Sequence, residues 1–324
     1  MKNDLIWSYL LHLGYNMWSD PEEKDGMRCH PMRKGTNRCA TDYLRCEKDM
    51  WDKITGELSK TGCNTIIIDV AEGVVYDSYP ELAVKGSWSK KQLSDEILRL
   101  KGMGFKVIPK LNFSAGHNIW MGKYGRMVST DEYYKFCDDI IDEVCELFEN
   151  PEYFHIGMDE ETFSIQKFQN MCIIRHGDLY WHDIFKLVNR IEKNGARAWM
   201  WTDYFWHTQE SEKSFVENMT KDILCSNWYY GDFKEEEPDW IVRSYLAYKK
   251  LEELGFDQVL AGGTWECDKN FDLTVQHAID NVAPERLKGF MMTTWEPTAK
   301  EYEKTLMNSA KIFKNVYDKY DSVL

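Results

Sequence analysis

The stretch YFHIGMDEETF, residues 153–163, begins as an apolar run and then passes through a glycine to three consecutive carboxylates. A short run rich in aromatic and branched residues predicts a buried strand. Asp159, Glu160 and Glu161 follow this strand almost directly. In a (β/α)8 barrel the active site lies at the carboxyl ends of the strands. We therefore take this strand end as the centre of a candidate active site.

Short apolar runs of the same kind recur along the chain, and sequence with helical periodicity lies between them. Several runs are preceded by a helix exit signal that contains Lys and Gly, such as LKGMGF, EKNGAR and EELGFD. The predicted strands are residues 9–16, 64–71, 105–113, 153–158, 196–201, 223–228, 258–265 and 289–295.

This alternation predicts the α/β class and a single (β/α)8 TIM barrel. No low-complexity linker or Pro/Gly-rich boundary divides the chain, so we predict one domain over residues 1–324. A doubly wound open sheet is the structural alternative. The long polar loop of residues 19–42 is predicted to form part of a lid or rim.

The charge balance is acidic, with 54 Asp and Glu against 40 Lys and Arg. Such a chain repels phosphate backbones and anionic membrane surfaces, so we expect neither nucleic acid nor membrane as a partner. No run has the length of a membrane-spanning helix. The nine cysteines lack CxxC or other metal-ligand spacing, which predicts mostly free thiols and a cytoplasmic location. A leader peptide removed from the chain stays an open alternative.

The predicted strand ends are rich in carboxylates and aromatic residues, and the chain has 13 Trp. Aromatic rings stack on the apolar faces of sugars, while carboxylates accept hydrogen bonds from hydroxyl groups and perform acid–base chemistry. Neighbouring acids also move each other's pKa values apart. A single Trp is as often a core residue, but the whole set predicts a carbohydrate pocket.

The segment YFHIGMDEE resembles the His-x-Gly-x-Asp-Glu motif of glycoside hydrolase family 20, the β-N-acetylhexosaminidases. Upstream, YPELAVKGSWSKKQLSDEILRLKGMGFKVIPKLNFSAGH is similar to the family's stretch from Tyr-Pro-Glu-Leu to Pro-Gly-His. Downstream, MWTDYF, SNWYYGD and TTWEP lie where the family has strand-end aromatics. The resemblance covers residues 60–300 and keeps the order of the motifs.

The resemblance implies a retaining exo-β-N-acetylhexosaminidase that releases terminal GlcNAc or GalNAc. In this family the substrate's 2-acetamido oxygen attacks the anomeric carbon and forms an oxazolinium intermediate. Glu160 matches the general acid and base, and Asp159 matches the residue that orients the acetamido group. Adjacent acids suffice because the nucleophile is tethered within the substrate. The implied partner is an N-acetylhexosamine-containing glycan, with no cofactor, and a homo-oligomer is an expectation that the sequence does not test.

Further strand-end residues match substrate-binding positions of the family. Trp201, Trp228 and Trp295 match the aromatics that enclose the sugar, and Glu296 matches the acid that binds its outer hydroxyl groups. The resemblance implies supporting roles for two histidines and a second-strand acid. The predicted substrate-binding set is Glu72, His117, His155, Trp201, Trp228, Tyr229, Trp265, Trp295 and Glu296.

The chain departs from the family pattern at several positions. Asn16 stands where the family's first strand ends in an arginine, and an amide lacks the bidentate donor fork of arginine. Met158 replaces a glycine of the motif, and Trp295 and Glu296 are adjacent instead of separated by one residue. Trp265 stands where a tyrosine is expected, so Tyr229 or Tyr230 would substitute for it.

Three alternatives to this function stay open. The same barrel could act on a different sugar, or bind sugar without catalysis. A third reading makes His117, His155, Asp159 and Glu160 ligands of a divalent metal in a hydrolase. The HExxH spacing is absent and adjacent acids chelate one ion poorly, so we predict no metal.

Overall fold

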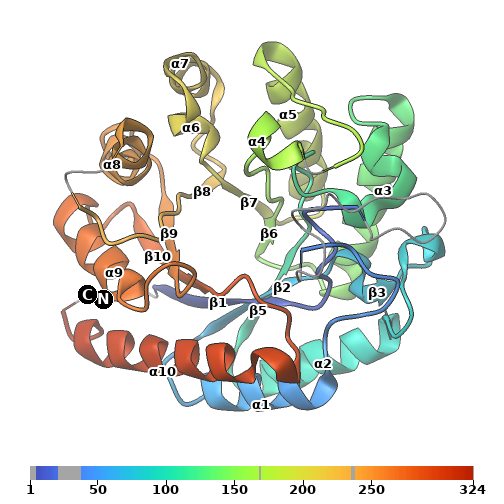
Figure 1. Cartoon of the computed structure of the whole chain (residues 1–324), viewed down its shortest axis with the longest axis horizontal. Helices are drawn as coiled ribbons and strands as arrows, with labels where there is room; N and C mark the ends of the chain where they lie inside the picture. The colour runs from blue at the N-terminus through green and yellow to red at the C-terminus, as the bar shows by residue number, and fades with distance from the viewer. Residues whose placement is uncertain (1–4, 21–37, 168, 235–237, 324) are drawn as a thin grey trace.

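A computed structural model describes residues 5–20, 38–167, 169–234 and 238–323. Eight parallel strands close into a barrel in the order β1-β10-β9-β8-β7-β6-β5-β2, and helices surround it (Figure 1). The predicted (β/α)8 TIM barrel is confirmed. The barrel strands are β1 (Ile6–His12), β2 (Thr65–Asp69), β5 (Lys106–Lys110), β6 (Tyr153–His155), β7 (Arg197–Trp201), β8 (Leu224–Ser226), β9 (Gln258–Gly263) and β10 (Leu287–Thr293).

Each of the eight predicted runs overlaps one barrel strand; six runs contain their strand, whereas β1 and β10 begin before the predicted run. The first prediction is displaced: β1 begins at Ile6 and ends at His12, before the polar segment that the run of residues 9–16 included. The ring closes because β1 pairs with β10 on one side and with β2 on the other. An open doubly wound sheet is thereby excluded.

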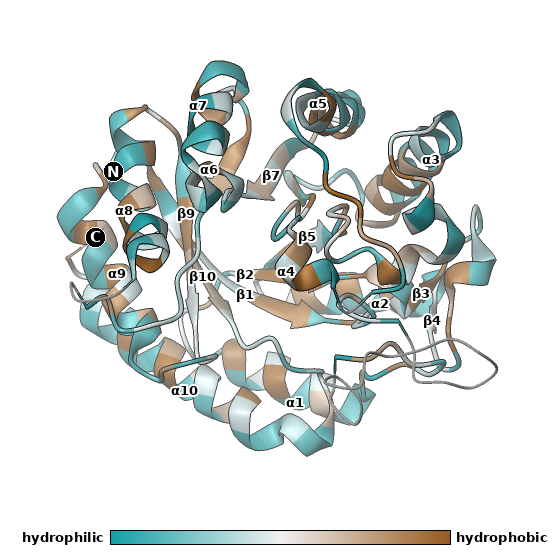
Figure 2. Cartoon of the chain, turned by 45° about the horizontal axis from the view of Figure 1, so that its top comes forward, coloured by the Kyte–Doolittle hydropathy of each residue, from teal (hydrophilic) through white to brown (hydrophobic). Residues whose placement is uncertain are grey.

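The helices present apolar faces to the strands and polar faces outward (Figure 2). α2 begins with a capping box in which the Ser89 hydroxyl accepts from the Gln92 N–H, while the Gln92 side chain accepts from the Ser89 N–H. The helices are α1 (Lys48–Leu58), α2 (Lys90–Gly102), α3 (Asp131–Leu147), α4 (Phe163–Gln166), α5 (Gly177–Lys193), α6 (Tyr204–His207), α7 (Gln209–Asn218), α8 (Asp239–Glu253), α9 (Asn270–Asn281) and α10 (Glu303–Tyr320).

Short elements decorate the ends of the strands. A two-stranded sheet of β3 (Val74–Val75) and β4 (Trp88–Ser89) lies outside the barrel. The 3-10 helices are η1 (Ala71–Gly73), η2 (Pro80–Leu82), η3 (Ile119–Arg126) and η4 (Lys300–Tyr302). In the described residues, no helix combines the length and the apolar character needed to cross a bilayer.

Three clusters of buried apolar residues make the core, the smallest of them formed by Tyr15, Met17 and Trp18. The largest one lies between the strands and the helices, and the second one fills the inside of the barrel with residues such as Leu10, Ile67, Trp199 and Met291. Because the interior is packed, a pocket can form only at an end of the barrel, and in this fold it forms at the carboxyl ends of the strands.

The cysteines fit the predicted thiols with one exception. Among the residues that the structure describes, seven cysteines are free, five of them buried, but Cys39 is disulfide-bonded. Disulfides persist mainly in oxidising compartments, so the disulfide at Cys39 argues against a cytoplasmic location. The cytoplasmic location stays a prediction. Most of the predicted lid at residues 19–42 lies outside the described residues.

Candidate active site

The carboxyl end of β6 turns sharply into the site. Gly157, Met158 and Glu160 all have positive φ, at 71°, 74° and 52°. A Cβ on Gly157 would lie 2.0 Å from the Asn112 Oδ1, so this position requires glycine for space as well as for its dihedral angle. The turn places the side chains of Asp159 and Glu160 at a cavity of about 270 Å³ that both residues line.

Asp159 and Glu160 face the same histidine. The His117 Nε2 lies 3.3 Å from the Asp159 Oδ2 and 3.2 Å from the Glu160 Oε2. The side chain of Asp159 is 7% exposed, whereas that of Glu160 is 29% exposed and open to the cavity. The two acids therefore lie on one side of the cavity, with the more accessible one outermost.

The charges of this cluster are mutually stabilised. Burial alone would lower the pKa of His117, but Asp159 and Glu160 raise it to about 10. Burial alone would raise the pKa of Asp159, but His117, Lys110 and a hydrogen bond from Asn112 lower it well below its usual range. The Asn112 Nδ2 donates to the Asp159 Oδ1 at 2.7 Å. At neutral pH, Asp159 is a fixed carboxylate beside an imidazolium.

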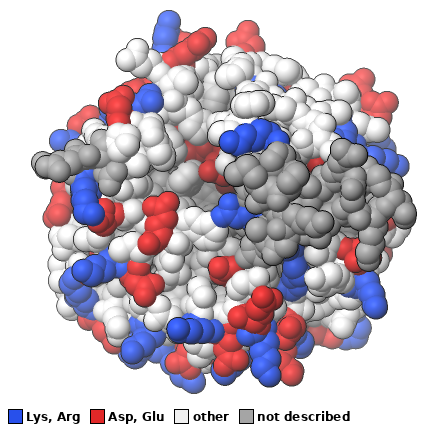
Figure 3. All heavy atoms as spheres, viewed as in Figure 1, with Lys and Arg blue, Asp and Glu red and all other residues white. Residues whose placement is uncertain are grey.

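Aromatic rings form the walls of the cavity. Four of the predicted residues, Trp228, Tyr229, Trp265 and Trp295, line it. Trp228 stacks on Tyr230, which also lines the cavity, with ring centroids 5.5 Å apart. The view in Figure 3 shows acidic atoms recessed in a hollow near the middle of this face. Apolar faces around recessed carboxylates suit a polyhydroxylated ligand.

Four predicted substrate-binding residues do not line this cavity. Trp201 is fully buried and packs against the rings of His155, at 4.6 Å, and Trp295, at 6.0 Å. His155 is fully buried, and its Nδ1 accepts from the Gly157 N–H at 3.0 Å. Burial and Lys110 lower the pKa of His155 well below its ordinary value, so it is neutral. Both residues support the site from the barrel interior.

The two remaining acids lie elsewhere. Glu72 is buried in η1, accepts the N–H groups of Tyr15 and Asn16, and lines a different cavity of about 500 Å³. Glu296 is half-buried and absent from the lining of the site cavity, where Glu266 is found instead. Glu266, next to Trp265, lines the cavity, and the role of Glu296 toward a sugar stays a prediction.

Asn16, which stands where the family has an arginine, does not face the cavity, and another arginine does. Asn16 is buried and exchanges hydrogen bonds with the main chain of Thr41, away from the cavity. Arg38 lines the cavity, with its guanidinium carbon 4.6 Å from the ring of Trp265 and 5.6 Å from that of Trp18. The site therefore has a guanidinium that comes from a loop instead of a strand end.

Sequence reasoning missed several lining residues. Arg38 lies in a loop, Trp206 in the short helix α6 and Trp240 in the first turn of α8, all beyond the strand ends that the sequence analysis considered. Trp240 is 56% exposed at the start of α8, and Ile165 of α4 reaches the same cavity. The only available signal was composition, because surface tryptophans are uncommon outside binding sites.

One donor set could hold a metal. Ligand atoms of His117, Asp159 and Glu160 lie within 4.8 Å of one another, whereas the predicted fourth ligand, His155, is outside this group. Metal ligation requires a neutral imidazole, and the raised pKa of His117 opposes it. The ion pairs with two carboxylates suit a protonated His117 better than a metal ligand.

Comparisons with known proteins agree with this architecture. No protein-family model matches the chain. Dispersin B shares 17% identity, with 85% of this chain and 96% of that chain covered and a TM-score of 0.58. A family 20 exo-β-N-acetylglucosaminidase from Vibrio harveyi shares 12% identity, with 97% of this chain and 54% of that chain covered and a TM-score of 0.61. The barrel has the glycoside hydrolase family 20 fold.

A curated relative supports the same direction at low identity. The lacto-N-biosidase of Bifidobacterium bifidum is 21% identical over 63% of this chain. The chain spans only 20% of the length of that protein, and about half of the Vibrio enzyme. The family 20 fold is thus shared with the two solved glycosidases.

Proposed function

We propose that the protein is a retaining exo-β-N-acetylhexosaminidase that releases terminal GlcNAc or GalNAc by substrate-assisted catalysis. The observation that carries the proposal is the position of Asp159 and Glu160 within 3.3 Å of one His117 nitrogen. Conventional glycosidases place two carboxylates on opposite sides of the sugar ring. Here the two adjacent acids contact one imidazole instead, an arrangement that suits a nucleophile tethered within the substrate itself.

Glu160 acts first as the acid. Its carboxyl group, the more exposed of the pair, protonates the glycosidic oxygen while the 2-acetamido oxygen attacks the anomeric carbon. The leaving alcohol departs and an oxazolinium forms. Glu160, now a carboxylate, takes a proton from a water whose oxygen bonds to the anomeric carbon on the face that the alcohol left. The bond between that carbon and the acetamido oxygen breaks, which opens the oxazolinium and restores the β configuration.

Asp159 serves the acetamido group. Its carboxylate accepts the amide N–H of the substrate and stabilises the positive charge that develops on the oxazolinium ring. Asn112 and His117 hold this carboxylate ionised and oriented before substrate binds. The aromatic walls exclude water and strengthen these interactions.

The test is hydrolysis of three aryl β-glycosides: the N-acetylglucosaminide, the N-acetylgalactosaminide and the unsubstituted glucoside. We expect turnover of the acetamido sugars and strong inhibition by a thiazoline analogue of the cyclic intermediate. No turnover of any acetamido sugar would refute the proposal. Calorimetric glycan binding that Glu160→Gln leaves unchanged, without product, would select the non-catalytic binding alternative.

A glycosidase with a different sugar specificity is the second candidate. The observation in its favour is that Arg38, from the loop after β1, supplies a guanidinium to the cavity while Asn16 faces Thr41. A guanidinium that enters the cavity from this loop would contact different sugar hydroxyl groups from one at the end of the first strand. Turnover of another glycoside from a wider aryl panel, at a higher kcat/KM than that of the acetamido sugars, would favour this candidate.

A further inference from the structure

The turn that carries the catalytic acid is strained. Met158 and Glu160 have left-handed φ values of 74° and 52° without being glycine. Such conformations persist only where the surrounding structure enforces them, and they cluster at functional sites. The contacts that enforce this turn therefore decide where the carboxyl group of Glu160 lies.

One side of the turn is held by polar groups from neighbouring strand ends. The Asn112 Oδ1 accepts the Met158 N–H at 3.2 Å, and the Ser114 hydroxyl donates to the Asp159 carbonyl. The Asp203 Oδ2 accepts the Glu160 N–H at 2.8 Å. These contacts fix the main chain up to Glu160.

The other side is held by Glu161, the third of the three acids. Its Oε1 accepts the Arg175 N–H and Nε–H, both at 2.8 Å. Its Oε2 accepts the Arg175 Nη2 at 2.6 Å and the Ala115 N–H at 3.0 Å. The side chain is 4% exposed. Glu161 is therefore an internal acceptor of four N–H groups and not a solvated acid.

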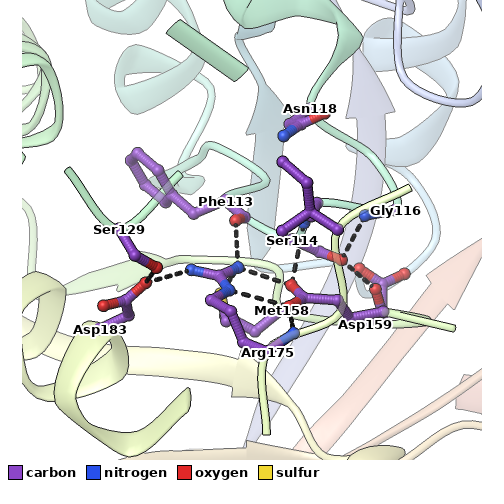
Figure 4. Close-up of polar contacts among 12 residues, drawn as sticks. Phe113, Ser114, Gly116, Asn118, Ser129, Met158, Asp159, Arg175 and Asp183 are labelled. Carbon is purple, nitrogen blue, oxygen red and sulfur yellow. Dashed lines mark hydrogen bonds and ion pairs between the residues drawn. The ribbon is translucent and has the colours of Figure 1, made fainter. Parts of the chain in front are cut away.

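Arg175 extends this contact to the rest of the site (Figure 4). Its Nη2 donates to the Phe113 carbonyl at 3.0 Å, and its Nη1 donates to the Asp183 Oδ2 at 3.0 Å. Asp183, on α5, also accepts the Ser129 hydroxyl at 2.6 Å. One guanidinium thus joins the segment after β5, the turn after β6 and the helix that follows.

The cluster stays ionised although it is buried. Burial alone would lower the pKa of Arg175, but Glu161 and Asp183 raise it well above its ordinary value. A planar guanidinium satisfies several carboxylate and carbonyl oxygens at fixed angles, which an ammonium group cannot do. Removing one partner would leave a buried charge uncompensated.

We propose that Glu161 and Arg175 are positioning residues that hold Glu160 in register with His117 and Asp159. This inference rests on the proposed role of Glu160 as the acid. Glu161 directly follows Glu160, so a displacement of its carboxylate rotates the preceding residue out of its left-handed conformation. The two residues act through the turn and do not line the cavity.

The test is Arg175→Lys, which keeps the charge and removes the fork. We expect kcat for an aryl N-acetyl-β-glucosaminide to fall by about 10-fold or more, with KM within about 3-fold, because misplacing a reacting group mainly costs turnover. The pKa of His117, about 10 in the native cluster, should move toward its ordinary value when Glu160 moves away. Imidazole NMR titration of the protein without substrate measures this change.

Arg99→Lys is the matched control. Arg99 also forks onto a buried acid, with its Nε 2.9 Å and 3.0 Å from the two oxygens of Glu96, but it lies on α2 and lines neither cavity. We expect a lowered Tm, with kcat and the His117 titration unchanged. Glu161→Gln is a second variant in case Arg175→Lys fails to fold, and it should move kcat in the same direction as Arg175→Lys.

The outcomes separate this inference from the proposed function. A folded Arg175→Lys protein whose His117 titration matches that of the wild type would overturn the inference, whether or not the enzyme turns over. Equal losses of kcat in Arg175→Lys and Arg99→Lys would also overturn it. A displaced His117 titration in a protein that hydrolyses no acetamido sugar would support the positioning role and contradict the proposed function alone.

Discussion

The ends of β2 and β6 present acids in two different ways. After β2, the chain enters η1, and Glu72 turns inward to accept the N–H groups of Tyr15 at 2.7 Å and Asn16 at 3.0 Å. After β6, the left-handed turn directs Glu160 to the cavity. Both acids follow a buried parallel strand, yet only Glu160 lines the cavity that the aromatic rings enclose.

The two carboxylates differ in whether they accept hydrogen bonds from main-chain N–H groups. Burial raises the pKa of Glu72 even though the Tyr15 and Asn16 N–H groups favour its charged form. At β6 the N–H of Glu160 is accepted by Asp203, so the Glu160 carboxylate is not needed by its own chain. A strand-end acid serves chemistry only where other residues complete the main-chain hydrogen bonding.

Glu160→Gln tests the difference between Glu160 and Glu72 most directly and should cause the largest loss of activity. An amide cannot donate a proton to the glycosidic oxygen, so kcat/KM on an aryl N-acetyl-β-glucosaminide should fall by about 10²–10⁴-fold. Steady-state kinetics measure the loss, and circular dichroism checks that the fold is kept. Retained turnover would remove Glu160 from the role of acid.

Asp159→Asn should have the next largest effect. The amide loses the charge that stabilises the oxazolinium, so turnover of acetamido substrates should fall by about 10²-fold or more. A substrate without the acetamido group does not use this interaction, so its low turnover should change far less. Equal losses on both substrates would show that Asp159 acts on the fold and not on the acetamido group.

The free energy of unfolding should depend on pH because Asp159 and Glu160 raise the pKa of His117. The folded-state pKa of His117, about 10, lies above its ordinary value of 6.5 because of Asp159 and Glu160. The stabilisation from this imidazolium is complete below pH 6.5 and is lost as the pH rises through about 10. Denaturant unfolding at several pH values should show this decline in the wild type and a flatter profile in His117→Gln. Parallel profiles would contradict the assignment.

Glu72→Gln should have the smallest effect on activity. The amide replaces one acceptor by donors that oppose the N–H groups of Tyr15 and Asn16, so the free energy of unfolding should fall by about 1–3 kcal/mol. We expect kcat/KM within about 3-fold of the wild type. A large rise in KM without a change in Tm would instead restore the sugar-binding role that the sequence predicted.

The strand ends were predictable because β-strand periodicity and helix exit signals are local. They located Asp159, Glu160, Trp228 and Trp295 correctly at one cavity. The orientation of Glu72 depended on a partner loop 56 residues away, at Asn16, which no local pattern reveals.

The partners of the buried and cavity-lining arginines could not be predicted from the sequence either. Arg175 reaches Glu161 from 14 residues further along, through a loop without periodicity. Arg38 likewise belongs to a loop whose path the sequence does not constrain. Residues that act through irregular segments are fixed by long-range packing, so their partners appear only in three dimensions.

The hydroxyl group of Tyr15 donates to the main-chain carbonyl of Trp295, so the first and last barrel strands meet at the pocket wall. These two residues lie 280 positions apart in the chain. Closing a loop of this length costs conformational entropy, which only the packed barrel offsets. During synthesis, Asp159 and Glu160 leave the ribosome well before β10 and Trp295, so the cavity that they line is complete only when the last strand closes the barrel.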